Sequence, residues 1–278
     1  MSEFALPSLW ENIDLETGLD QLARLRFDEA KKNLQDARKH QVGNPDVIAA
    51  AVAACTYWKR SVAELSVNTP TNEWIAGFQE QIAEYAFVPQ LERLKKNLLR
   101  LLATHAEQYP GLQDSTLEAL FDTLLTAKVQ DAAESLITRY CMAHPETYRL
   151  LYLLAQAAWH NNSRSKAISH YKKALLYYPD PAMLDRLEDP ELKKLAKKYP
   201  PELVPAYAWI EGKHSLIPIV DQPTPLHDAH GKAVAGYGYL RQAHNALLQQ
   251  QDPLPARAKL KEVAPELYAA YFEMLKAK

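Results

Sequence analysis

Histidine and aspartate, the residue types that most readily bind metals or transfer protons, gather between residues 214 and 230. His227 and His230 could present two imidazoles to a zinc ion, with Asp221 nearby, whereas His214 lies further upstream. Zinc signatures on helices place two histidines four residues apart around a glutamate, or use paired cysteines, and neither pattern occurs. A simpler interpretation is that Asp228 caps the following helix and that the histidines are solvated. A metal-dependent enzyme using Asp221, His227 and His230 is therefore kept as an alternative to the main hypothesis, a protein without enzymatic activity.

The other residues that could carry catalysis lack the spacing that chemistry requires. Gly231, Gly236 and Gly238 do not have the spacing of a phosphate-binding loop, and no Gly-x-Ser-x-Gly nucleophile turn occurs. Cys55 and Cys141 lie in apolar helical stretches without metal-ligand spacing, which is typical of buried thiols in a reducing compartment. We therefore expect a protein that is not an enzyme and has no cofactor and no metal.

Charge and composition exclude several classes of partner. The 278 residues carry 32 basic and 34 acidic side chains, a net charge of −2 that gives no overall positive field for nucleic acid or an anionic membrane surface. The N-terminal residues have no basic start followed by an apolar run, and no stretch of eighteen apolar residues occurs. We expect a cytoplasmic protein with no nucleic-acid partner and no membrane insertion.

The secondary structure of the chain is expected to be mainly helical. Glycine is scarce, at 8 residues, and apolar residues recur at spacings of three and four through most of the first two hundred positions. Asn44-Pro45-Asp46 predicts the start of a helix that ends near 67–70, and 89–109 predicts another. Prolines mark the starts and ends of such segments. The sequence therefore predicts an all-α fold of antiparallel helix pairs.

The composition changes near residue 200, where prolines become frequent. Six prolines fall among residues 200–225, which predicts an extended, irregular segment near 200–227. Helical spacing returns at about 233–250 and from 265 to the C-terminus. We predict a helical-repeat domain over residues 1–199, and a second part over residues 200–278 whose terminal helices pack on the same body.

A shift of 34 residues superimposes two stretches of the sequence. It places Ala133 on Ala167 and Pro145 on Pro179, and the preceding helices also align through Leu117 and Leu151. An antiparallel helix pair cannot bury both of its apolar faces alone, so neighbouring pairs are expected to stack into a continuous core.

The second of these units resembles the tetratricopeptide repeat. It carries Ala167-x3-Tyr171-x2-Ala174-x4-Pro179 after Leu151-x2-Leu154-Ala155-x2-Ala158, the small residues at helix crossings and the closing proline of that family. The first unit has Tyr140 in place of the second small residue, and residues 15–41 form a fainter echo. The resemblance covers about residues 114–180 and implies a short right-handed α-solenoid.

The resemblance also implies which residues face a ligand. In this family the first helix of each pair lines the concave wall, which here presents a cation, an amide and flat aromatic rings that suit an extended peptide. The residues are Arg149, Tyr152, Gln156, Trp159 and His160, joined by Glu118 and Asp122 from the preceding unit. An equally open interpretation is that Tyr152 and Trp159 pack against the next helix.

These features together predict a protein–protein interaction module or adaptor. It would hold a peptide segment of a partner in a concave helical groove and carry out no chemistry of its own. A second alternative is a self-capped structural protein, in which the chain's own Pro-rich segment, residues 216–226, occupies that groove.

Overall fold

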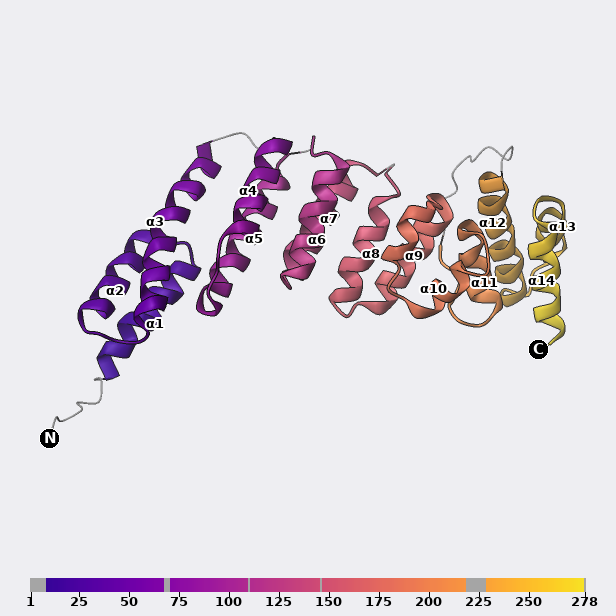
Figure 1. Ribbon diagram of the computed structural model, residues 1–278. Coiled ribbons are helices and arrows are strands. Elements are labelled where there is room, and N and C mark those ends of the chain that lie inside the picture. Colours follow the sequence, from indigo (N-terminus) through magenta and orange to yellow (C-terminus); the bar gives the residue numbers. More distant parts are fainter. Residues whose placement is uncertain (1–8, 68–70, 110, 146, 219–228, 278) are drawn as a thin grey trace. The chain divides into compact units, whose positions relative to one another are not determined.

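The computed structural model describes residues 9–67, 71–109, 111–145, 147–218 and 229–277. Within these ranges the chain forms fourteen α-helices and three short 3-10 helices and no β-strand, which confirms the predicted all-α class (Figure 1). The chain divides into two compact units, residues 1–139 and 140–278. This division lies inside a helix, Gln130–Ala143, and not at the change of composition near residue 200.

Several helices of the first unit pack on a neighbouring helix. α1 packs on α2, α2 packs on α3, and α4 contacts both α5 and α6. Trp58 of α3 is fully buried and its ring lies against those of Phe78 and Tyr85, at centroid distances of 5.8 and 5.3 Å. The elements are α1 (Leu9–Ala23), α2 (Phe27–Lys39), α3 (Pro45–Val67), α4 (Asn72–Glu84), η1 (Pro89–Leu91), α5 (Glu92–Ala106), α6 (Asp114–Thr126) and α7 (Gln130–Ala143), the last of which crosses the division.

The second unit contains two hydrophobic clusters. One joins α8 and α9 to the segment that follows them, through residues such as Tyr171, Leu175 and Leu187, and the other joins α11 to the C-terminal helices through Tyr237 and Tyr271. The elements are α8 (Leu150–His160), α9 (Arg164–Tyr177), η2 (Pro181–Arg186), α10 (Pro190–Ala196), η3 (Pro201–Leu203), α11 (Val204–Ile210), α12 (Ala229–Leu248), α13 (Leu254–Val263) and α14 (Pro265–Lys276).

The helix ends reproduce the 34-residue period. α7 and α9 begin and end 34 residues apart, and so do the ends of α6 and α8. The turns match as well, because Lys128 and Asn162 both have φ 59° and the amides that follow them, of Val129 and Ser163, donate to carbonyls five residues earlier at 2.9 and 2.8 Å. This is the hydrogen-bond pattern of a helix C-terminus closed by a left-handed residue. The two segments therefore share one local plan.

The first part of the Pro-rich segment is helical, and the prediction of irregular structure is wrong there. Pro201 is the first residue of η3, and Pro205 lies in the first turn of α11. An amide at the start of a helix has no intrahelical acceptor, so a proline there removes no hydrogen bond, and its fixed φ suits the helix. Prolines in this chain therefore begin helices where their frequency suggests a loop.

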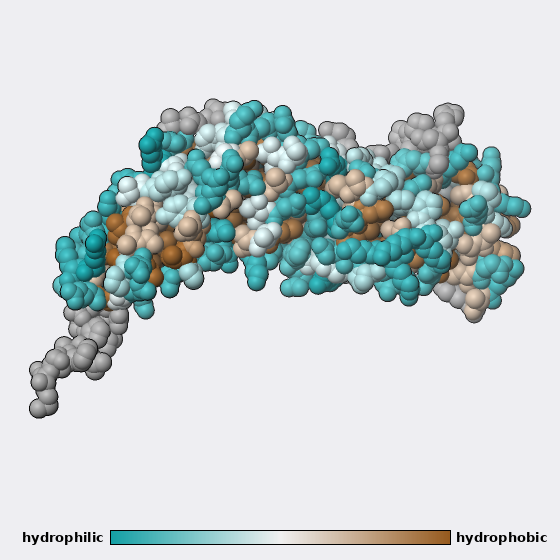
Figure 2. All heavy atoms as spheres, viewed as in Figure 1, coloured by the Kyte–Doolittle hydropathy of each residue, from teal (hydrophilic) through white to brown (hydrophobic). Residues whose placement is uncertain are grey.

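Hydrophilic residues cover most of the face shown in Figure 2, and hydrophobic residues gather on the part of it formed by α1–α3. Ile13 and Tyr57 are among the large apolar side chains that stay exposed. None of the helices in the described ranges is both long and apolar enough to cross a membrane.

Candidate functional site

The structure places the aromatic and amide residues at the centre of the predicted α8 site in the interior. Tyr152 is fully buried, and its hydroxyl donates to the carbonyl oxygen of Tyr178 at 3.1 Å. Burial raises the pKa of Tyr152, so the hydroxyl stays protonated. Gln156 is 8% exposed, and its Oε1 accepts from Nη1 of Arg186 at 3.0 Å. In this structure both side chains hold the segment after α9 against α8 and present no face to a partner.

The other predicted residues of α8 retain exposed surface. Trp159 is half-buried, and the guanidinium of Arg164 lies 3.6 Å from its ring centroid. His160 is exposed, with Nε2 3.9 Å from Oε1 of Glu188. Arg149, directly before α8, is half-buried. Arg149 lies directly before α8, and Trp159 and His160 are its last two residues, so the exposed surface is divided between the two ends of the helix.

The remaining predicted residues lie elsewhere in the chain. Glu118 and Asp122 are on α6 in the first unit, half-buried and exposed respectively, so the predicted groove draws on residues of both units. Asp221 and His227 of the metal alternative lie outside the described residues, and so does most of the segment 216–226. His230 is in the first turn of α12. Among the described residues no group of three metal-ligating side chains gathers.

The described start of the Pro-rich segment is packed on α12. Ile217 is buried in the same cluster as Tyr237, whose hydroxyl accepts from the Ile217 amide at 2.8 Å. Self-capping of α8 by residues 216–226 would therefore have to begin from a segment whose first residues are held on another helix.

A pocket of about 370 Å³ opens between the end of α7, the start of α8 and one face of α9. Lys173 and Tyr177 are four residues apart on α9, so they share that face. The ring of Tyr177 stacks on that of Tyr148 with centroids 4.8 Å apart. His144 and Leu151 complete much of the lining. The size and the aromatic walls are those of a site that holds one side chain or a small ligand.

The thiol in this pocket, that of Cys141, has a raised pKa. Cys141 is half-buried and makes no disulfide, and burial raises its pKa to about 11. A thiol that stays protonated at neutral pH reacts slowly as a nucleophile.

A second cluster of charged side chains is buried between α9 and α10, and no pattern in the sequence predicts it. Lys172 is fully buried, and its ammonium donates to the carbonyl oxygen of Ser215. Asp189 caps α10 by accepting from the Leu192 amide at 2.8 Å, and its Oδ1 lies 3.1 Å from Nε2 of His214. The cluster fastens residues 214 and 215 to the body of the second unit.

The protonation of this cluster follows from its burial and its hydrogen bonds. Burial lowers the pKa of Lys172 to about 8, although the negative charge of Asp189 acts in the opposite direction. Burial would raise the pKa of Asp189, but hydrogen bonds from His214 and the Leu192 amide outweigh it and lower that pKa below its usual value. Each of these polar groups is hydrogen-bonded to another residue of the chain, which indicates a structural role for the cluster.

Comparisons with protein-family models, with curated proteins and with solved structures found no match for this chain.

Proposed function

We propose that this chain is a non-enzymatic interaction module that binds a segment of another protein. The observation that carries the proposal is the open pocket of the second unit, with Tyr148 and Tyr177 stacked in its wall and Lys173 beside them. Aromatic rings of this kind supply large contact areas at a low cost in conformational entropy, and such residues dominate protein interfaces. The pocket would receive an apolar side chain of the partner, and Lys173 would favour an acidic neighbour.

The tetratricopeptide-like character of the chain remains part of this proposal. The matching bounds of α7 and α9, the matching C-terminal ends of α6 and α8 and the matching turns support a repeat of helix pairs. Stacking such pairs as a right-handed α-solenoid would bury their second faces. Arg149, Trp159 and His160 are proposed to extend the contact along α8, while Tyr152 and Gln156 support it from the interior. Free thiols at Cys55 and Cys141 accord with a cytoplasmic location.

A randomised peptide library selected on the whole chain tests the pocket. We expect the selected peptides to share an apolar residue next to glutamate or aspartate. The Kd of a selected peptide should rise at least about tenfold in Tyr148→Ala, which removes one aromatic wall, and in Lys173→Glu, which reverses the charge. The measurement is fluorescence anisotropy, with circular dichroism to verify that each variant keeps its helix content.

Met142→Ala is the matched control, because Met142 belongs to the same segment, is 75% exposed and does not line the pocket. Its Kd should equal that of the wild type. Equal affinity of wild type, Tyr148→Ala and Lys173→Glu would reject the pocket. A loss of peptide affinity that occurs only in Trp159→Ala would show that the peptide binds at α8 and not in the pocket.

A further inference from the structure

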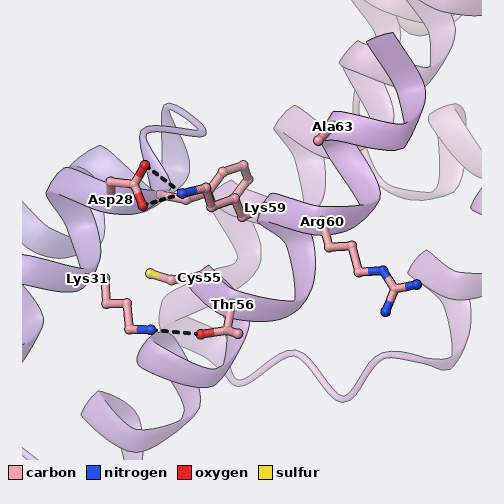
Figure 3. Close-up of a pocket in the computed structure, with 8 residues that line it drawn as sticks. Asp28, Lys31, Cys55, Thr56, Lys59, Arg60 and Ala63 are labelled. Atoms are coloured by element: carbon pink, nitrogen blue, oxygen red, sulfur yellow. Dashed lines mark hydrogen bonds and ion pairs between the residues drawn. The ribbon is translucent and has the colours of Figure 1, made fainter. Parts of the chain in front are cut away.

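A second pocket, of about 320 Å³, lies in the first unit between α2 and α3, and nothing in the proposed function uses it. Its lining comes from one face of each helix. Phe27 and Lys31 are four residues apart on α2, and Thr56, Arg60 and Ala63 follow one another at helical spacing on α3. Figure 3 shows Lys31 and Thr56 beside Cys55, whereas the side chain of Arg60 extends away from it.

The floor of this pocket is apolar and chemically inert. Phe27 and Cys55 are both buried at its base. Burial raises the pKa of the Cys55 thiol to about 11, and the thiol forms no disulfide. A protonated, buried thiol behaves as a small hydrophobic group, so the floor offers contact to an apolar side chain and no nucleophile.

The rim of the pocket is predominantly cationic. Lys59 is paired with Asp28, with Nζ 2.6 and 2.8 Å from the two carboxylate oxygens, and Arg60 is paired with Glu64 at 3.0 Å. Lys31 differs, because its ammonium donates to the hydroxyl of Thr56 at 3.3 Å and, among the described residues, has no carboxylate within ion-pair distance (Figure 3). With Glu64, the partner of Arg60, included, three cations stand against two carboxylates at the rim, and the excess positive charge is that of Lys31.

These ion pairs do not prevent a ligand from using the cations. Lys59 and Asp28 are both exposed, with 55% and 77% of their side-chain surface accessible, and exposed pairs contribute little to stability. A ligand carboxylate over the pocket could therefore engage Lys31 directly and compete with Asp28 for Lys59. A ligand that combines an apolar group, which contacts the floor, with a carboxylate, which pairs with the rim cations, is therefore complementary to the whole pocket.

We propose that the pocket between α2 and α3 binds an acidic segment of a partner protein, with an apolar side chain on Phe27 and Cys55 and a neighbouring carboxylate on Lys31. Nucleic acid fits less well, because the apolar floor would gain no partner from a phosphate backbone and the chain as a whole is slightly acidic. The site is separate from the pocket of the second unit, so either can fail without the other.

The probe is a fluorescein-labelled peptide of about ten residues in which glutamates alternate with leucines. It is titrated onto the whole chain carrying Lys173→Glu, because this change removes the affinity that the pocket of the second unit is proposed to have for the same kind of peptide. We expect saturable binding that weakens as salt rises, because the attraction to the exposed ammonium groups is screened. A peptide with glutamine at every glutamate position should bind at least about fivefold more weakly. No saturable binding below about 1 mM, or equal binding of both peptides, would overturn the proposal.

Two variants locate the site, each with a control. Lys31→Gln should weaken the glutamate peptide about threefold or more, whereas Lys32→Gln makes the same charge change at the next position, which does not line the pocket, and should bind as the wild type does. Ala63→Tyr adds a ring at an exposed position of the lining and should block binding while keeping every charge. Equal effects of Lys31→Gln and Lys32→Gln, or full binding by Ala63→Tyr, would contradict this location.

Discussion

The residue that departs most from its ordinary environment is Lys172. Its neighbour Lys173 is half-buried in an open pocket, whereas Lys172 is sealed in the interior and reaches the carbonyl oxygen of Ser215, 43 residues further along the chain. Placing an ammonium group in the interior costs free energy because the charge loses its hydration. The hydrogen bond and the negative charge of Asp189 offset part of that cost.

This burial predicts a pH dependence of stability. The folded-state pKa of Lys172, about 8, lies below its ordinary value of 10.5, so between these values the unfolded chain binds more protons than the folded one. The free energy of unfolding should therefore gain a contribution that rises from pH 8 to pH 10.5, by roughly 3 kcal/mol in total. Urea titrations of wild type and Lys172→Met across this interval measure the contribution as the difference between the two curves.

The comparison with a variant is necessary because other groups act in the same interval. Burial raises the pKa of Cys55 and of Cys141 from 9.0 to about 11, and these thiols make the free energy of unfolding fall between those values. They are present in both proteins and cancel in the difference. Lys173→Met serves as control for the loss of one lysine at the neighbouring position. A Lys172→Met curve that runs parallel to that of the wild type would show that Lys172 is not buried as a charge.

At the scale of elements, the turns between paired helices depend on left-handed residues that are not glycine. Leu25 follows α1, Lys128 follows α6 and Asn162 follows α8, with φ of 62°, 59° and 59°. A side chain in this conformation is strained by contact between its Cβ and the backbone, at about 1–2 kcal/mol per residue. The chain accepts this strain because the turn satisfies the last carbonyls of the preceding helix.

Glycine at such a position should stabilise the protein. Lys128→Gly removes the Cβ at an exposed site, and we expect the free energy of unfolding to rise by about 0.5–1 kcal/mol after the extra flexibility of glycine in the unfolded chain is subtracted. Ala127→Gly, one residue earlier, is the matched control. Ala127 has ordinary right-handed geometry with φ −76°, so glycine there should lower stability by a similar amount. The measurement is urea denaturation. Midpoints that shift in the same direction in Lys128→Gly and Ala127→Gly would contradict the left-handed conformation of Lys128.

For the whole molecule, the spacing of apolar residues and the positions of prolines predict the helices better than they predict the contacts between helices. Pro45 begins α3 and Pro265 begins α14, as expected from the tolerance of a first turn for proline. The segment 201–210 is helical although it is rich in proline, because the number of prolines does not tell whether each can occupy a first turn. The spacing of residues along a helix identifies its faces, but it does not tell which face meets another part of the chain.

In the candidate site, too, the sequence predicts the helix face but not the residues that cover it. The sequence places Tyr152 and Gln156 on one side of α8 with Trp159, but Arg186 and the Tyr178 carbonyl, both from the chain after α9, cover the first two. The pocket walls Tyr148 and Tyr177 lie 29 positions apart, and their stacking is a consequence of how α9 returns along α8. Contacts of this kind depend on tertiary packing, and a single sequence does not contain a periodic signal for them.

The most direct test of protein binding by this chain is a crystal structure of the whole chain with a peptide selected from the randomised library. We predict that an apolar side chain of the peptide lies against the rings of Tyr148 and Tyr177, with a peptide carboxylate within hydrogen-bond distance of Nζ of Lys173. A peptide bound elsewhere, with that pocket unfilled, would contradict the proposed site.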